Sequence, residues 1–268
     1  MNILLTNDDG VHAPGMRALC ASLPSGVHAV IAAPATERSA SSHSITLGDK
    51  LRVEEDVFEG IPRHSVHGTP ADSVKFAIGA LRKTFKPDLI VSGINQGANT
   101  GVSVFYSGTI SAAREGFISG IPAMAVSLAS KTSLDFSAAV WITRRLIEGF
   151  RDRAFASRVM LNVNVPPLRL DQIRGVRAGK QAASRFVEEF VLERTHDGKK
   201  IYSLTGEIEI LDPDGTSDEE LVVEGFIAVT PLQIDLTDYA SLAAFQEWVK
   251  HTGLGVCAAS DGADRPGF

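Results

Sequence analysis

Two adjacent carboxylates directly follow a short apolar run near the start of the sequence. Residues 2–6 read Asn-Ile-Leu-Leu-Thr, and Asn7-Asp8-Asp9-Gly10 comes next. Because a buried strand that ends in two acids places two like charges side by side, a positive group is expected between or above them. Carboxylate oxygens favour hard divalent cations such as Mg²⁺, Mn²⁺ or Ca²⁺. Asp-Gly is also a common turn, so this segment alone leaves a solvated turn as an equal alternative.

Three later loops carry side chains that could complete such a site, at residues 37–44, 92–101 and 106–116. Ser39 and Asn95 could supply neutral oxygen ligands that complement two carboxylates without adding charge. The step Ser107-Gly108-Thr109 opens a helix, whose N–H groups and dipole favour an anion, most often a phosphate. Each loop alone is a weak signal, since a lone Ser is usually solvated and Asn95 and Asn99 could be turn residues. Their co-occurrence indicates a site for a metal and a phosphate.

The elements that would position these loops alternate over the first two-thirds of the chain. Strands are predicted at 3–6, 27–33, 89–92, 123–128 and 159–165, and helices at 14–23, 70–85 and 135–150. Near-continuous apolar strands separated by amphipathic helices are typical of an α/β, Rossmann-like, doubly wound and mainly parallel sheet. Ligands of such sheets bind at the carboxyl ends of the strands, where the polar loops would meet.

The segment Thr69-Pro70-Ala71-Asp72 predicts the start of a helix, with Thr69 as N-cap and Pro70 as its first residue. Ordinary capping explains Asp72 better than a direct catalytic role. Phe105 and Tyr106 could stack on a nucleotide base or belong to the core, and the core is favoured for Phe105.

The pattern changes after Pro167. Strands at 185–193 and 199–204 around His196-Asp197-Gly198 predict a hairpin. An acidic loop at 211–220, a strand at 221–229, a helix at 241–250 and an irregular tail at 252–268 are expected to follow. We divide the chain into a catalytic core, 1–166, and a C-terminal part, 167–268, whose hairpin and tail would make subunit contacts.

Composition excludes several classes of function. The 268 residues carry a net charge of −6 and no run of Lys or Arg, so no nucleic-acid partner is expected. The two cysteines, Cys20 and Cys257, are far apart, which argues against a thiolate zinc site, and Cys20 is expected in the core. With no signal peptide and no run of 18 apolar residues, we expect a cytoplasmic protein without a membrane partner.

Several motifs in order through the first half of the chain resemble the survival protein SurE family. They are Asn7-Asp8-Asp9-Gly10, Ser39, Gly68 to Asp72, Ser92 to Gly101, and Tyr106 to Gly116. The family consists of metal-dependent nucleotidases with the character of acid phosphatases. The matching motifs lie in roughly the first half of the chain, and the length of the chain fits the whole family domain.

The resemblance implies one divalent metal per subunit, Mg²⁺ or Mn²⁺, held at Asp8, Asp9, Ser39 and Asn95. It implies that Asn99, Ser107, Gly108 and Thr109 lie near the bound phosphate. It also implies removal of phosphate from nucleoside 5′- and 3′-monophosphates, action on short polyphosphate by some members, and a homodimer or homotetramer with exchanged C-terminal segments. Asp8 and Asp9 would be the catalytic residues, and one of them would also act as general base.

Two rival functions belong to other classes. A non-catalytic nucleotide sensor would keep the phosphate turn at 107–109 but would have less need of a metal site. A Rossmann oxidoreductase would carry Gly-x-Gly-x-x-Gly after the first strand, where this chain has two acids instead.

Overall fold

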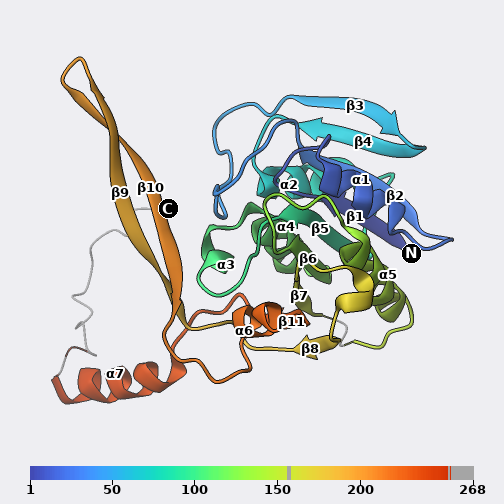
Figure 1. Ribbon diagram of the computed structural model, residues 1–268. Helices are drawn as coiled ribbons and strands as arrows, with labels where there is room; N and C mark the ends of the chain where they lie inside the picture. Colours follow the sequence, from blue (N-terminus) through green and yellow to red (C-terminus); the bar gives the residue numbers. More distant parts are fainter. Residues whose placement is uncertain (156–157, 253, 255–268) are drawn as a thin grey trace, which may run out of the picture. The chain divides into compact units, whose positions relative to one another are not determined.

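The computed structural model describes residues 1–155, 158–252 and 254 (Figure 1). The chain forms two compact units. The first is Met1–Leu232, and the second begins at Gln233. All of the predicted site residues belong to the first unit.

A nine-stranded sheet forms the centre of the first unit, in the order β3-β4-β2-β1-β5-β6-β7-β11-β8. Its strands are β1 (Asn2–Thr6), β2 (His28–Pro34), β3 (Val53–Phe58), β4 (Ile61–Val66), β5 (Leu89–Gln96), β6 (Ala123–Leu128), β7 (Met160–Val165), β8 (Val176–Ala178) and β11 (Ile227–Leu232). The run from β4 to β7 is parallel throughout, whereas β3 and β11 lie antiparallel to β4 and β7. The predicted mainly parallel α/β sheet is confirmed.

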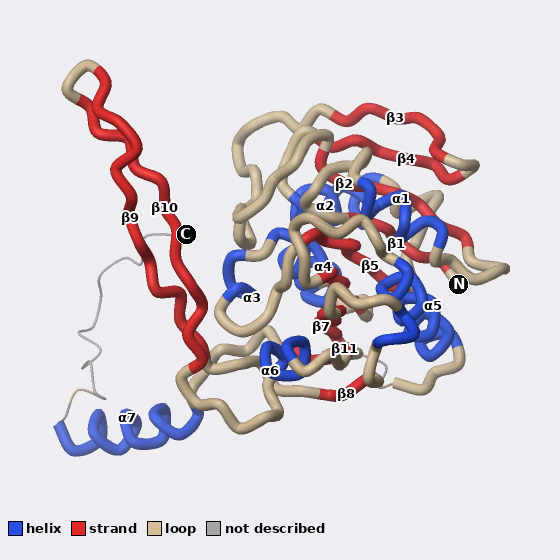
Figure 2. Tube along the Cα trace, viewed as in Figure 1, coloured by secondary structure: helices blue, strands red, loops and turns tan. Residues whose placement is uncertain are grey.

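Helices cover both faces of this sheet (Figure 2). They are α1 (Pro14–Ala21), α2 (Pro70–Ala80), the single turn α3 (Ser103–Tyr106), α4 (Gly108–Ile118), α5 (Ser137–Arg151), the 3₁₀ turn η1 (Leu170–Gln172) and α6 (Asp218–Val223). The helices α1 and α5 pack together over one face, and α2 and α4 pack together over the other. This arrangement is doubly wound, as the alternation of strands and helices predicts.

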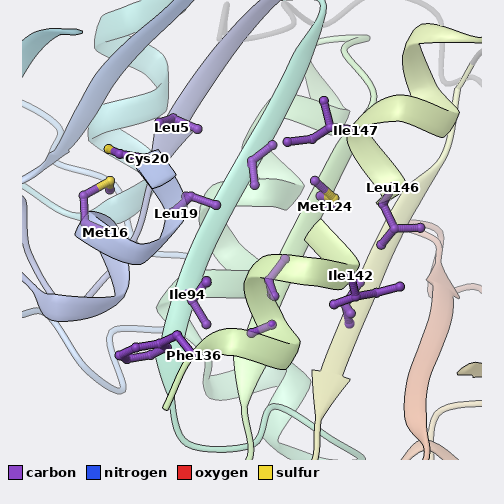
Figure 3. Close-up of a cluster of buried hydrophobic side chains, with 14 of the residues drawn as sticks. Leu5, Met16, Leu19, Cys20, Ile94, Met124, Phe136, Ile142, Leu146 and Ile147 are labelled. Atoms are coloured by element: carbon purple, nitrogen blue, oxygen red, sulfur yellow. The ribbon is translucent and has the colours of Figure 1, made fainter. Parts of the chain in front are cut away.

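The core explains why β1 reads as an unbroken apolar run. Side chains alternate along a strand, and Leu5 belongs to one buried cluster that also contains Leu19 of α1 and Ile142 of α5 (Figure 3). Leu4 packs in a second cluster with Val74 of α2 and Ile110 of α4. Both faces of β1 are therefore buried, and its C-terminal end cannot shift without disturbing two layers.

Two predicted segments in the last third differ from the structure. The strand expected at 221–229 is wrong in its first half, because residues 218–223 form α6 and β11 begins only at Ile227. Ser217 explains this: its hydroxyl accepts from the Glu220 N–H and the Glu220 carboxylate reaches back to Ser217, which is a capping box. The same cap ends the expected acidic loop three residues early.

The strands β3 and β4 have no counterpart in the sequence-based expectation. β3 reads Val-Glu-Glu-Asp-Val-Phe and lies at the edge of the sheet with its acidic side chains exposed. Edge strands often carry charges that prevent further pairing, so they lack an apolar signature. Helix α2 also ends at Ala80, earlier than the expected residue 85.

The hairpin is confirmed and is longer than expected, with β9 (Ser184–His196) and β10 (Lys199–Ile210) paired antiparallel. Asp197 and Gly198 both have positive φ, which is the geometry of a tight turn between twisted strands. In the second unit, α7 (Tyr239–Thr252) contains the predicted helix 241–250. The tail predicted at 252–268 lies almost wholly outside the described residues.

The division into a catalytic core, 1–166, and a C-terminal part for subunit contacts, 167–268, remains a prediction. The strands β8 and β11, which follow this point, belong to the central sheet.

No helix in the described part of the chain has the length and apolar character needed to cross a membrane.

Candidate active site

A cavity of about 680 Å³ lies where the polar loops meet. Six of the predicted site residues line it, namely Asp8, Asp9, Ser39, Asn95, Asn99 and Ser107. They come from the loops after β1 and β2, from β5 and the loop after it, and from the start of α4. Residues up to 99 positions apart are thus gathered at the carboxyl ends of parallel strands, as expected for this kind of sheet.

The turn after β1 is braced by Asn7, which is fully buried. Its Nδ2 donates to the Gly10 carbonyl at 2.9 Å, and the Gly10 N–H donates to its Oδ1 at 3.1 Å. Gly10 has a φ of +100°, which favours glycine at this position. The braced turn holds the two adjacent carboxylates at the end of a fixed strand.

Asp8 is only 4 % exposed, and its carboxylate contacts the first turn of α4. The Thr109 hydroxyl donates to Asp8 Oδ1 at 2.5 Å. A Cβ on Gly108 would lie 2.7 Å from Asp8 Cβ, so glycine is needed for this close approach. Burial raises the pKa of Asp8, and the hydrogen bonds from Thr109 oppose that rise.

Asp9 lies beside Asp8 and is less buried. Desolvation and the Asp8 charge raise the pKa of Asp9 to about 6, against a hydrogen bond from the Gln96 backbone N–H. Two neighbouring carboxylates that each resist ionisation are the arrangement that a bound cation would stabilise.

The loop after β2 carries Ser39 to the cavity. The Arg38 N–H donates to the Asp8 carbonyl at 2.7 Å, which ties this loop to the turn after β1. The Ser39 hydroxyl donates to Glu37 Oε1 at 2.6 Å. Because its proton is held by Glu37, the Ser39 oxygen keeps lone pairs for another partner.

The residue after Ser39 shows that the loop is held in an uncommon conformation. Ala40 has a φ of 54° and Ser42 a φ of 52°, a region that non-glycine residues seldom occupy. The Ser42 N–H donates to the Tyr106 carbonyl at 3.1 Å, and its hydroxyl donates to the Phe105 carbonyl at 2.8 Å. These bonds hold the loop against α3 and offset the strain.

Asn95 and Asn99 differ in what surrounds them. Asn95 Nδ2 donates to the Gly97 carbonyl at 2.8 Å, which leaves its side-chain oxygen as the free end of the amide. Asn99 is 6 % exposed, and its Nδ2 donates to Ser127 Oγ at 2.8 Å. Asn164 Oδ1 accepts from the Asn99 N–H at 2.8 Å, so Asn99 is fixed by the strands β6 and β7.

Ser107 is the N-cap of α4, and its hydroxyl accepts from the Ile110 N–H at 3.1 Å. Gly108 and Thr109 are not among the residues that line the cavity; they lie behind Asp8. The start of α4 therefore has two parts: Ser107 borders the cavity, and the next two residues position Asp8.

Glu37 and Lys131 line the same cavity and were not predicted as site residues. Tyr106, for which base stacking and a place in the core were both left open, also lines it. Lys131 lies in an unpatterned loop after β6, so no motif marks it. Phe105, expected in the core, is 45 % exposed, and the expectation is wrong because α3 is a single turn with one buried side chain. Asp72 caps α2 as predicted, and it also accepts from Thr46 in the loop that carries Ser39.

The donor set suits a hard cation better than zinc. Within the described residues, no group of three or more His, Cys, Asp or Glu side chains is placed to hold a metal. Two carboxylates with a hydroxyl and an amide oxygen are instead the oxygen-only set that Mg²⁺ and Mn²⁺ accept. Cys20 is a buried residue of α1 and does not line the cavity.

Comparison with known proteins shows the family to which the chain belongs. The family described as survival protein SurE matches residues 3–188. A protein named 5′-nucleotidase SurE from Synechococcus sp. (strain JA-3-3Ab) is 43 % identical over 254 residues, covering 92 % of this chain and 97 % of the relative. A protein of the same name from Symbiobacterium thermophilum is 43 % identical over 250 residues, covering 92 % and 97 %.

A solved structure, that of the SurE protein from Aquifex aeolicus, superposes with a TM-score of 0.80 at 31 % identity. The match covers 92 % of this chain and 99 % of that one. Since the family's range contains every residue of the cavity described above, the motifs, the fold and the relatives all lead to one assignment. The chain belongs to the survival protein SurE family.

Proposed function

We propose that this chain is a metal-dependent phosphomonoesterase that hydrolyses nucleoside 5′-monophosphates to nucleoside and phosphate. Nucleoside 3′-monophosphates and short polyphosphate are further substrates under this proposal. The observation that carries it is the convergence of two adjacent carboxylates, the buried Asp8 and the half-buried Asp9, and the N-terminus of α4 on one cavity. The relatives named 5′-nucleotidase support the substrate class.

One Mg²⁺ or Mn²⁺ per subunit would be held by Asp8, Asp9, Ser39 and Asn95. The residues fit such an ion, because all four line one cavity and each side chain carries an oxygen that can act as a ligand. When bound, the ion would polarise a phosphoryl oxygen and lower the pKa of water near it.

Side chains of the protein would orient the metal ligands, accept a proton and bind the phosphate. Thr109 fixes the orientation of Asp8, and Glu37 fixes the Ser39 hydroxyl. Asp8 or Asp9 would accept the proton of the attacking water as general base. Asn99 and Ser107, which line the cavity, would lie beside the phosphate, while Gly108 and Thr109 would act through Asp8. The α4 dipole would stabilise charge that develops on the phosphate.

The rival is a nucleotide sensor that binds without turnover. It would need the phosphate-binding end of the cavity but not a pair of carboxylates. The close packing of Gly108 on Asp8 and the hydrogen bond from Thr109 favour the enzyme, because they orient a side chain that a sensor would not need.

Asp8→Asn tests the proposal. The substitution keeps the shape and removes one of the charges that attract the cation, so Mn²⁺ affinity should fall at least about tenfold and turnover should be lost. Calorimetric Mn²⁺ titration and phosphate release measure the two effects, with the exposed Asp49→Asn as control. Unchanged Mn²⁺ affinity and turnover in Asp8→Asn would contradict the assignment.

The same variant also separates a folding defect from a site defect. Because burial disfavours the charged form of Asp8, the neutral Asn should not lower the melting temperature of the metal-free protein. A large drop in that temperature would indicate that lost activity came from misfolding.

A further inference from the structure

The charges around the cavity are unevenly distributed. Three carboxylates line it, those of Asp8, Asp9 and Glu37. Among the described residues that line it, Lys131 is the sole lysine or arginine. The proposed function uses the carboxylates and leaves this cation without a role.

Lys131 reaches the cavity along a specific path. It lies three residues beyond the end of β6, in an exposed segment of the chain. A Cβ on Gly97 would lie 4.0 Å from Lys131 Cγ and 3.7 Å from Asn95 Nδ2. The aliphatic part of the Lys131 side chain therefore lies beside Gly97 and close to Asn95. A side chain at position 97 would occupy the space between Lys131 and Asn95.

The ammonium group is free to meet a ligand. Within the part of the chain that the structure describes, no residue forms a hydrogen bond or ion pair with Lys131, although three carboxylates line the same cavity. An unpaired lysine on a flexible four-carbon stem can follow an anion into the site at small geometric cost.

We propose that Lys131 binds the phosphoryl group of the substrate as a point charge. This inference rests on the proposed function and deepens it. A nucleoside monophosphate carries its negative charge on the phosphate alone, so an ammonium in the cavity has one complementary group on the substrate. A lysine ammonium group cannot act as a ligand of the metal ion, because the two positive charges repel each other. The ammonium group can instead offset the negative charge that the carboxylates present to an incoming phosphate dianion.

The proposal predicts that phosphate binding weakens while Mn²⁺ binding does not. In Lys131→Met, the inhibition constant of inorganic phosphate and the KM for a nucleoside 5′-monophosphate should both rise about tenfold, since one charge-assisted contact is lost. The Kd for Mn²⁺, measured by calorimetry without phosphate, should stay the same or fall because a repelling charge is gone.

Two variants complete the experiment. Lys131→Arg keeps the charge and should hold both phosphate constants within about threefold of the wild type, as lysine and arginine differ in geometry. Lys83→Met removes an exposed lysine after α2, outside the cavity, and should change nothing.

Three results would overturn the proposal. They are an unchanged phosphate inhibition constant in Lys131→Met, a weakening of Mn²⁺ binding equal to that of phosphate, and an equal effect in Lys83→Met. Phosphate binding to the Mn²⁺-loaded protein can also be titrated by calorimetry, with no turnover. If the wild type hydrolyses no nucleoside monophosphate, the proposed function fails, and this titration still decides the role of Lys131.

Discussion

Gly108 is a single residue on which the position of a catalytic carboxylate depends. Its missing side chain allows α4 to approach Asp8 so closely that a Cβ would lie 2.7 Å from the Asp8 Cβ and 2.9 Å from its Oδ2. Neither group has room to retreat, because Asp8 and Gly108 are both buried. The same contact lets Thr109 reach Asp8 with its hydroxyl.

We therefore expect Gly108→Ala to destabilise the protein by about 1–3 kcal/mol through overpacking, and to lower turnover as Asp8 shifts. Gly79→Ala is the matched control. Gly79 also lies in a helix, but a Cβ there meets nothing within 4 Å. That variant should gain about 0.5–1 kcal/mol, because alanine is the better helix former. Urea unfolding and phosphate release measure both, and equal effects of the two substitutions would refute the packing argument.

At the residue scale, the sequence revealed the side chains that chemistry requires and missed those that act through geometry. Asp8, Asp9 and Asn95 were predicted from residue type, and the structure gathers them in one cavity. Lys131 could not be found, since an isolated lysine in a loop has no pattern. The role of Thr109 in holding Asp8 depends on a contact between residues 101 positions apart, which spacing along the chain does not show.

At the scale of elements, the start of α2 and the long loop after β2 are joined by Asp72. Its carboxylate accepts from the Thr46 N–H at 2.9 Å, the Thr46 hydroxyl at 2.7 Å and the Thr69 N–H at 2.8 Å. Burial opposes ionisation of Asp72, yet these hydrogen bonds outweigh it and lower its pKa. One side chain thus caps a helix and anchors the loop that carries Ser39.

Asp72→Asn should lower the free energy of unfolding at neutral pH by about 1–3 kcal/mol, because an amide nitrogen cannot accept the bonds that a carboxylate oxygen accepts. A carboxylate whose pKa is lowered on folding contributes stability above its unfolded pKa and loses it as pH falls through the folded value. The difference between wild type and variant should therefore shrink below about pH 4. Urea unfolding at several pH values checks this, and a difference that stays constant down to about pH 3 would contradict it.

The predicted elements were most accurate where one local signal decides the outcome. Residues 123–128 form β6 as expected, since an apolar run of this length in a parallel sheet is buried on both faces. The start of α2 at Pro70 followed from its cap. The prediction at 221–229 was wrong because the apolar residues at the end of α6 and the start of β11 are close in sequence and resemble one strand. The capping box at Ser217 is the local signal that marks α6 as a helix.

At the scale of the whole molecule, the hairpin of β9 and β10 is the feature that the first unit does not explain. It exposes large apolar side chains on both strands, including Phe190, Leu192, Tyr202 and Leu204. An isolated two-stranded ribbon is marginally stable in water, and exposed apolar surface of this kind marks an interaction site. The homodimer or homotetramer therefore remains a prediction, with this hairpin as its expected contact surface.

Light scattering should accordingly give a mass of two or four times 28.6 kDa for the intact chain. Phe190→Asp places a charge on this apolar surface and should shift the mass towards that of the single chain. Glu188→Asp, on the same strand, conserves charge and should leave the mass unchanged. A single-chain mass for the wild type would contradict the expectation.

The proposed function requires that this cavity hydrolyses phosphate esters with the help of a divalent metal. Phosphate release from nucleoside 5′- and 3′-monophosphates, with Mn²⁺ or Mg²⁺ and with EDTA, tests it most directly. We expect release with metal, none with EDTA, and recovery when excess metal is added back. Release that persists in EDTA would contradict the role of the metal. No release with any metal, from a folded protein that binds nucleotide, would instead identify a sensor.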